Sequence, residues 1–152
     1  MNIALEPLDV NNWLKICELT VSEDQKQVFP IANVYWIGIS RYEERTELFA
    51  IKQGDNYVGL IGCGYDDDGV TGYINPLMVD VYYQRQGIAA EAIRLIIQYL
   101  ADNLKVNKIN IGHRKANQAA GRLYERIGFE IISETEREYK RSLYLEEQND
   151  NN

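Results

Sequence analysis

The chain has 152 residues and a formal net charge of −7, with 45% hydrophobic and 26% charged residues. These values indicate one globular domain with its own core, and the acidic balance argues against nonspecific nucleic-acid binding, which needs a basic face. No apolar run approaches the roughly 20 residues that cross a bilayer, so we expect no membrane segment and a cytoplasmic location.

Apolar patterning in the first half of the chain predicts both helices and strands. The expected elements are, in chain order, a strand over 3–8 that stops at Pro7, a helix capped by Asp9 or Asn11 with Trp13, Leu14 and Cys17 on its apolar face, a loop and a second helix over 22–42, strands over 48–51 and 57–63 joined by a hairpin at Gly54-Asp55-Asn56, and a third strand over 71–81.

Helical spacing and turn residues divide the second half in the same way. The expected elements are a helix from Gly87 to about Asn103 with Ile88, Ala92, Leu95, Ile96, Tyr99 and Leu100 on one face, a strand over 108–112, a helix capped by Asn117 and ended by Gly128 with Ala120, Leu123, Tyr124 and Ile127 inward, and strands over 129–133 and 139–145. This order indicates a mixed α/β domain with one sheet over 1–146, followed by a disordered polar tail over 147–152.

Several common kinds of site are excluded or disfavoured. Cys17 and Cys63 lie far apart, without the close spacing of a zinc site or a disulfide framework. His113 is the only histidine, which rules out a paired-histidine site. The run Asp66-Asp67-Asp68 lacks the alternating ligands and the distal glutamate of a calcium loop, so it favours a solvated turn. We therefore expect no bound metal.

A polar segment, Gln84-Arg85-Gln86-Gly87-Ile88-Ala89, lies between a predicted strand and the long helix. A helix start exposes unpaired backbone N–H groups and the positive end of the helix dipole. Small residues at Gly87 and Ala89 would let a phosphate approach that backbone, and Arg85 would add positive charge. Taken alone, the segment is equally typical of a helix start that binds nothing.

Pro76 lies inside the third predicted strand, where it cannot donate a ladder hydrogen bond, so we expect a bulge there. A bulge would bend the strand and free backbone groups near Leu77, Met78 and Val79 for an extended, amide-bearing ligand. A strand edge that binds amides, followed directly by a phosphate loop, matches the order of groups in coenzyme A. Its pantetheine arm precedes its pyrophosphate.

Two motifs in this chain resemble those of the GNAT superfamily of N-acetyltransferases. Leu77-Met78-Val79-Asp80 with Tyr83-Gln84-Arg85-Gln86-Gly87-Ile88-Ala89 resembles the acetyl-CoA motif, Q/R-x-x-G-x-G/A. Asn117-Gln118-Ala119-Ala120-Gly121-Arg122-Leu123-Tyr124-Glu125-Arg126-Ile127-Gly128-Phe129 resembles the second signature, N-x-x-A…LY-x-x-x-GF. Val21-Ser22-Glu23-Asp24-Gln25 and the short domain are similar to bacterial diamine (spermine/spermidine) N-acetyltransferases.

The resemblance, which covers nearly the whole chain, implies the GNAT fold. That fold has a single, mostly antiparallel sheet of about six to seven strands flanked by about four helices, with a splay between the two central parallel strands. The resemblance implies acetyl-CoA as co-substrate, bound at Leu77, Met78, Val79, Gln84, Arg85, Gln86, Gly87, Ile88, Ala89, Ala90, Asn117, Ala120 and Tyr124.

Tyr124 would be the catalytic residue that protonates the departing CoA thiolate. A phenol with a pKa of about 10 suits this role because it stays protonated at neutral pH. Without the surrounding motif, Tyr124 would be interpreted as a core tyrosine of an amphipathic helix. The implied reaction is direct attack of an amine on the thioester in a ternary complex, since no Ser/His/Asp or Cys/His arrangement supports an acyl-enzyme.

The general base stays open. Polyamine acetyltransferases of this type often carry a carboxylate where this chain has Asn75, and an amide cannot act as a base. Glu23, Asp24, His113 and a water chain are the alternatives.

The acceptor implied by the resemblance is a small-molecule diamine or polyamine such as spermine or spermidine. The residues expected to bind it are Glu23, Asp24, Tyr35 and Asn75, through charge pairing with an ammonium and through tyrosine ring faces. Two alternatives stay open: acetylation of a protein N-terminus or an aminoglycoside, and a non-catalytic acetyl-CoA-binding module. A homodimer is expected by resemblance only, and no nucleic acid or membrane is expected as a partner.

Overall fold

The computed structural model describes residues 1–146, and the polar tail predicted over 147–152 lies outside the described residues. A seven-stranded sheet runs through them in the order β1-β2-β3-β4-β5-β7-β6. Its strands are β1 (Ile3–Pro7), β2 (Glu47–Gln53), β3 (Asn56–Tyr65), β4 (Thr71–Val79), β5 (Lys108–Arg114), β6 (Glu130–Glu134) and β7 (Glu138–Tyr144).

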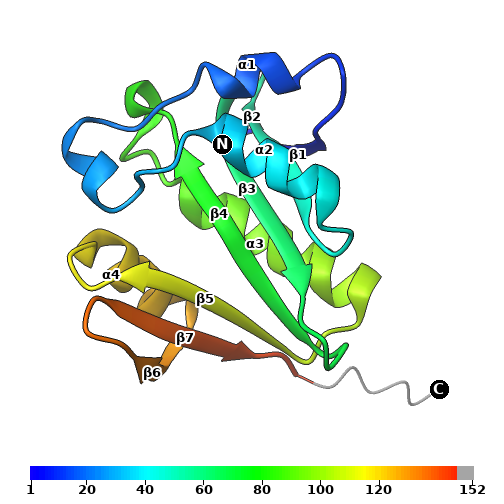
Figure 1. The fold of residues 1–152 in the computed structure, drawn as a ribbon, viewed down its shortest axis with the longest axis vertical. Helices are drawn as coiled ribbons and strands as arrows, with labels where there is room; N and C mark the ends of the chain where they lie inside the picture. Colours follow the sequence, from blue (N-terminus) through cyan, green and yellow to red (C-terminus); the bar gives the residue numbers. More distant parts are fainter. Residues whose placement is uncertain (147–152) are drawn as a thin grey trace.

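The helices flank this sheet on both faces (Figure 1). They are α1 (Trp13–Cys17), α2 (Asn33–Tyr42), α3 (Ile88–Tyr99) and α4 (Gln118–Ile127), with short turns η1 (Asp24–Gln27), η2 (Val81–Tyr83) and η3 (Leu100–Leu104). α1 and α2 pack on one face, and α3 and α4 pack on the other. None of the described helices is long and apolar enough to cross a membrane. The mixed sheet with four flanking helices confirms the predicted fold class.

Two helices show how far apolar spacing specifies the buried face. In α3 the predicted positions Ile88, Ala92 and Ile96 are buried, and Ile93 joins them. In α1 the prediction is wrong at Leu14, which is 60% exposed, and it misses Ile16, which is fully buried, whereas Trp13 and Cys17 are half-buried. α1 has only five residues, which is too few for a periodic apolar face to specify which side is buried. Packing against α2 and the sheet determines instead which of its side chains point inward.

The predicted bulge in β4 is confirmed. Ile61 pairs with Leu77 and Cys63 with Ile74, so Asn75 and Pro76 together stand opposite Gly62. A Cβ on Gly62 would lie 2.6 Å from the Asn75 carbonyl oxygen. Glycine is therefore required where the bulged strand approaches β3.

The bulge coincides with the point where the sheet splays. β4 and β5 run parallel and pair only from Thr71–Lys108 to Ile74–Ile111. Beyond Ile74, β4 remains paired with β3 as far as Val79 but leaves β5. Within the described residues, the edge of β4 that faces β5 therefore lacks a strand partner from Asn75 to Val79, as the predicted splay requires.

Candidate active site

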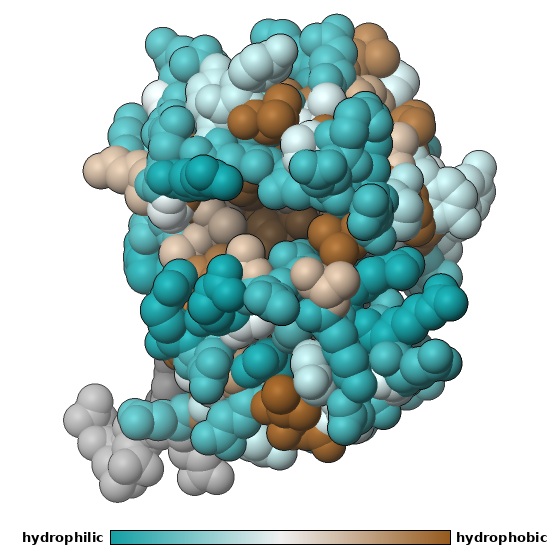
Figure 2. Space-filling model, turned by 90° about the vertical axis from the view of Figure 1, so that its left-hand side faces the viewer, coloured by the Kyte–Doolittle hydropathy of each residue, from teal (hydrophilic) through white to brown (hydrophobic). Residues whose placement is uncertain are grey.

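A cavity of about 610 Å³ opens where β4 and β5 separate. Its walls come from those two strands, the segment before α2, the start of α4 and the β6–β7 hairpin. Figure 2 shows this face, with a hollow whose floor is hydrophobic and whose rim is mixed, with hydrophilic residues above it and some apolar residues at its sides. The apolar lining includes Phe29, Leu77 and Ile111, so an organic ligand of moderate size would be sheltered from water.

The loop before α3 has the backbone geometry of an anion site. Gly87 caps the helix with a φ of +79°, a left-handed conformation that glycine adopts at little cost. Among residues 1–146, no side chain caps the first turn of this 12-residue helix, so its N–H groups remain free to bind phosphate oxygens. Arg85 also has a positive φ, +63°, a strained conformation that is concentrated at functional sites.

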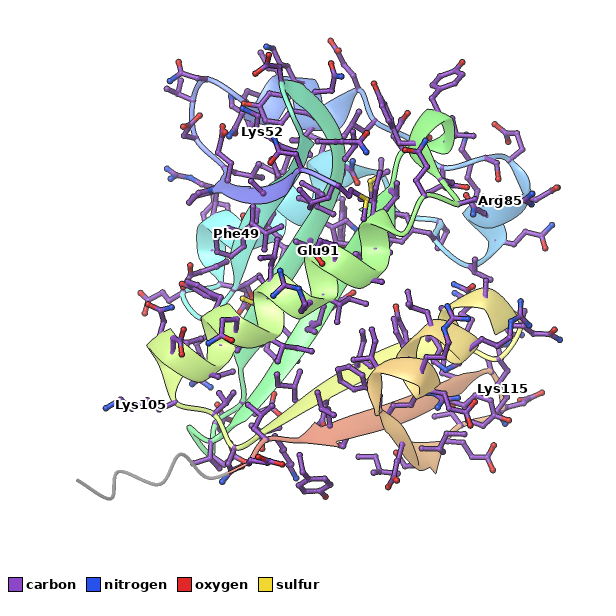
Figure 3. All side chains as sticks on the ribbon, turned by 180° about the vertical axis from the view of Figure 1, so that it is seen from behind. Phe49, Lys52, Arg85, Glu91, Lys105 and Lys115 are labelled. Atoms are coloured by element: carbon purple, nitrogen blue, oxygen red, sulfur yellow. The ribbon has the colours of Figure 1, made fainter. Side chains whose placement is uncertain are left out.

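Arg85 lies beside the N-terminal end of α3, where its charge adds to the positive end of the helix dipole (Figure 3). Gln84, by contrast, makes hydrogen bonds within the protein. Its amide nitrogen donates to the Val79 carbonyl at 2.9 Å and to Gln25 Oε1 at 2.6 Å. Gln84 therefore joins the end of β4 to η1, and its amide is already committed.

Tyr124 lies on the inner face of α4 and lines the cavity. Its side chain is 6% exposed, and burial raises the pKa of its phenol to about 12. A phenol with this pKa is protonated throughout the neutral range and can donate a proton to a thiolate.

Asn117, also on the cavity wall, accepts a hydrogen bond from the Ala120 N–H through Oδ1 at 3.2 Å. It thus caps α4, as the sequence predicts. Its side-chain N–H groups remain able to bind a ligand carbonyl, because the cap uses only the oxygen.

His113 does not offer a free base. Its Nε2 lies 3.0 Å from Arg141 Nε, and because arginine only donates, Nε2 must be the acceptor. The proton is then on Nδ1, which donates to the Arg114 carbonyl at 3.0 Å. Both ring nitrogens are committed, so the interpretation of His113 as a candidate base is corrected.

The residues predicted to bind the acceptor separate into two groups. Asn75 lines the cavity. Glu23, Asp24 and Tyr35 do not line it. Glu23 pairs with Lys26 at 2.8 Å on the surface, and Asp24 is the first residue of η1. Tyr35 is 59% exposed, and its ring packs edge to face with Trp36.

Sequence reasoning missed four charged residues on the cavity wall, Arg114, Glu134, Glu138 and Lys140. Glu134 is paired with Lys115 at 2.6 Å. In the register of β5 and β7, Arg114 stands opposite Glu138, and Lys140 stands opposite Gly112. Strand alternation could have placed them on one face, but it does not show that this face borders the cavity. The wall therefore carries both signs of charge.

Comparison with known proteins agrees with this architecture. A sequence model described as the Acetyltransferase (GNAT) family matches residues 9–129. The chain belongs to this family. Membership makes it an acetyl-CoA-dependent N-acetyltransferase.

Individual GNAT relatives are distant. Spermine/spermidine N(1)-acetyltransferase of Bacillus subtilis (strain 168) is 26% identical over 140 residues, which cover 88% of this chain and 91% of that protein. The structure of spermidine N-acetyltransferase from Vibrio cholerae in complex with CoA and spermine has a TM-score of 0.79 at 15% identity, covering 94% of this chain and 95% of that one. N-acetyltransferase PseH of Campylobacter jejuni, in complex with acetyl coenzyme A, has a TM-score of 0.71 at 18% identity, covering 95% and 99%. The two structures share the fold of this chain.

Proposed function

We propose that this protein transfers the acetyl group of acetyl-CoA to a primary amine bound in the cavity between β4 and β5, and that the amine is a diamine or polyamine. The observation that carries the proposal is the separation of β4 from β5 after Ile74, because it exposes a strand edge directly beside Tyr124. The GNAT assignment supplies the reaction class.

The coenzyme would bind along the free edge of β4 and across the first turn of α3. Backbone groups between Asn75 and Val79 would hydrogen-bond the amides of the pantetheine arm. The uncapped N–H groups of Ile88, Ala89 and Ala90, with Arg85, would hold the pyrophosphate. A backbone N–H of β4 near Met78 would also stabilise the oxyanion that forms on the thioester carbonyl.

In the reaction the amine nitrogen bonds to the carbonyl carbon, and the carbon–sulfur bond breaks. Tyr124 donates its proton to the departing thiolate, which leaves as the free thiol. The amine must lose its own proton before or during attack, because a primary amine is largely protonated at neutral pH. Of the bases that the sequence suggests, Glu23 and Asp24 lie outside the cavity lining and His113 is committed. The groups that remain are water at the open side of the cavity, to which we assign the proton, and the wall carboxylate of Glu138.

Two observations support a di- or polyamine acceptor. Relatives that cover most of this chain are named as spermine or spermidine acetyltransferases. The net charge of −7 favours the approach of a cation.

The cavity wall itself favours a second candidate. Arg114, Lys140 and Glu138 form no ion pair with any residue of the described chain. The two cations, Arg114 and Lys140, outnumber the carboxylate of Glu138, and Glu134 on the same wall is paired with Lys115. The cations would attract a carboxylate on the acceptor. An amino acid or a peptide, whose amine is accompanied by a carboxylate, is therefore the competing acceptor.

A thiol-release assay with acetyl-CoA distinguishes these acceptors. Spermine, spermidine and putrescine are compared with free amino acids and short peptides at equal concentrations. The proposal expects the highest kcat/KM for a polyamine. If a carboxylate-bearing amine gives the highest kcat/KM, the polyamine assignment is wrong and the acceptor is an amino acid or a peptide. Lys140→Glu provides a control, since it should raise KM for a carboxylate-bearing amine and lower it for a polyamine.

The homodimer and the cytoplasmic location stay predictions. The dimer can be tested by the molar mass of the purified chain in solution, measured by light scattering. The location can be tested by fractionating cells that express the native protein.

A further inference from the structure

Arg141 on β7 is a buried cation without a carboxylate partner among residues 1–146. Its side chain is 8% exposed, and it appears in none of the ion pairs. Burying a charge costs free energy unless hydrogen bonds compensate. Its hydrogen bonds run to His113 Nε2 at 3.0 Å and to the Phe129 carbonyl at 3.1 Å. The guanidinium thus joins β5 to the chain just after α4.

His113 lies between two aromatic rings. Its ring centroid is 5.6 Å from that of Tyr124 on α4 and 5.6 Å from that of Tyr139 on β7. The Tyr124 ring meets it edge to face, at 66°, an arrangement that aromatic pairs prefer. Since both imidazole nitrogens are hydrogen-bonded, the imidazole has a fixed orientation. The imidazole that packs against the Tyr124 ring is therefore held in place by groups of β5 and β7.

α4 approaches this pair at a glycine. A Cβ on Gly121 would lie 3.1 Å from His113 Cε1 and 3.6 Å from Arg141 Nη2. Gly121 precedes Tyr124 by three residues, so the two share one face of the helix. The helix can lie directly on the pair because this position has no side chain.

The backbone of Tyr124 is connected to the same pair. Its carbonyl accepts from the Phe129 N–H at 2.9 Å and from the Gly128 N–H at 3.1 Å, which closes the end of α4. The Phe129 carbonyl in turn accepts from Arg141. Arg141 therefore contacts Phe129, whose N–H binds the Tyr124 carbonyl, while His113 contacts the Tyr124 ring.

We propose that His113 and Arg141 form a positioning pair that sets the place of the Tyr124 phenol in the cavity. The inference deepens the proposed function and rests on it, since it concerns the residue that protonates the thiolate. His113 lies on the cavity wall beside Tyr124, but both of its ring nitrogens are hydrogen-bonded within the protein. In this scheme the pair therefore bonds to neither coenzyme nor amine and acts through Tyr124. Small displacements of an acid matter, because an error of about 1 Å can cost on the order of 100-fold in rate.

Gly121→Ala tests the pair without removing any hydrogen-bonding group. The added methyl would displace α4 from His113 by a few tenths of an ångström. Alanine also favours helix over glycine, so the helix itself is not weakened. We expect kcat to fall roughly 10-fold while KM for acetyl-CoA stays within about twofold. Gly38→Ala on α2, where an added Cβ meets nothing within 4 Å, is the matched control and should leave kcat unchanged. An unchanged kcat in Gly121→Ala, or an equal loss in both variants, overturns the proposal.

A double-mutant cycle tests whether the pair acts through Tyr124. His113→Gln retains an acceptor for Arg141 but removes the imidazole ring. It should lower kcat roughly 10-fold in the Tyr124 enzyme and less than about 2-fold in the Tyr124→Phe enzyme, because the phenol that it positions is then absent. An equal loss in both backgrounds shows a different role for His113 and overturns the inference. If His113→Gln does not fold, Gly121→Ala in the two backgrounds gives the same comparison.

A third measurement separates failure of this inference from failure of the proposed function. The protein is labelled with 3-fluorotyrosine, and the resonance at position 124 is identified by its loss in Tyr124→Phe. That ¹⁹F resonance should shift in Gly121→Ala and stay in place in Gly38→Ala, whether or not any amine is acetylated. A resonance that does not move in Gly121→Ala contradicts the positioning role. If the resonance shifts but no amine is acetylated, the pair still positions Tyr124 and only the proposed reaction fails.

Discussion

At the scale of single residues, Tyr124 combines a protonated phenol with a place on the cavity wall. Burial alone raises its pKa to about 12, and no neighbouring charge is needed to keep it neutral. A proton donor must still hold its proton when the thiolate departs, and a phenol with a pKa of about 12 does so at neutral pH. Because a thiol has a pKa of about 8.5, the raised pKa also weakens the driving force for transfer of that proton. Tyr124 can therefore act as an acid without titrating in the working range.

Replacing Tyr124 by phenylalanine should remove the proton and keep the ring packing. We expect kcat to fall roughly 100-fold, within the usual range for loss of a general acid, while the Kd for acetyl-CoA changes little. Steady-state kinetics and calorimetric titration measure the two quantities. A kcat equal to that of the wild type would remove Tyr124 from the mechanism.

The raised pKa of Tyr124 also predicts how folding stability and kcat depend on pH. The folded value, about 12, exceeds the ordinary value of about 10, so the phenol favours folding when it is protonated. Its contribution is complete below pH 10 and is lost as the pH rises toward 12. Tyr124 should therefore cause no decrease in kcat between pH 7 and pH 9. A descending limb in that interval that disappears in Tyr124→Phe would contradict the assignment.

At the scale of elements, two pieces of backbone form the proposed coenzyme site. The β4 bulge frees a strand edge, and the loop before α3 presents uncapped N–H groups. Both depend on a glycine for a different reason. Gly62 is needed for close approach between strands, whereas Gly87 is needed for a positive φ.

Gly62→Ala should damage the bulge. The added Cβ would meet the Asn75 carbonyl oxygen and the Pro76 ring, and overpacking of this kind costs about 1–3 kcal/mol. We expect a lower Tm and a weaker affinity for acetyl-CoA, measured by thermal denaturation and calorimetry. Gly72→Ala, where the nearest atom would be a Val106 methyl at 3.3 Å, should change both less. Equal effects in the two variants would show that the bulge has no special part in binding.

Gly87→Ala should combine backbone strain with loss of coenzyme affinity. An alanine at a φ of +79° costs about 1–2 kcal/mol, and relieving that strain would rotate the first turn of α3. Gly69, with a φ of +74° in the β3–β4 turn, gives a matched control. Both variants should have a similarly lowered Tm, but only Gly87→Ala should weaken acetyl-CoA binding. If Gly87→Ala binds acetyl-CoA as tightly as the wild type does, the phosphate site lies elsewhere.

At the scale of the whole molecule, the cavity lies between two halves that share little sheet pairing. β1 to β4 carry α1 to α3, β5 to β7 carry α4, and four residue pairs join β4 to β5 (Figure 1). A ligand that bridges β4 and α4 would supply contacts that the sheet lacks there. Binding should therefore stabilise the fold as a whole.

Acetyl-CoA at about 100 times its Kd should stabilise the folded chain by about 2.7 kcal/mol. For a chain of this size, that corresponds to an increase in Tm of roughly 5–10 °C. Scanning calorimetry with and without coenzyme measures the shift, and Gly87→Glu should abolish it through a steric block and repulsion of phosphate. If the wild-type Tm does not respond to saturating coenzyme, the proposed coenzyme site is wrong.

Much of this protein follows from local features of the sequence. The order of strands and helices, the bulge at Pro76, the Asn117 cap and the Gly128 ending are all predicted correctly, because periodicity, proline and glycine act within a few residues of themselves. The motif around Gly87 also identifies the helix start whose backbone the structure leaves uncapped. These features are specified by the chain before any long-range contact forms.

Other features were decided only by the tertiary structure. The contact between His113 and Arg141 joins residues 28 positions apart. Alternation along β7 places Arg141 and Lys140 on opposite faces, but it does not show which face meets α4. Likewise, the position of η1 leaves Glu23 and Asp24 outside the cavity lining, while the pairing of β5 with β7 brings Arg114, Glu138 and Lys140 onto its wall. Periodicity specifies which face a side chain occupies, but the packing of distant elements determines what that face meets.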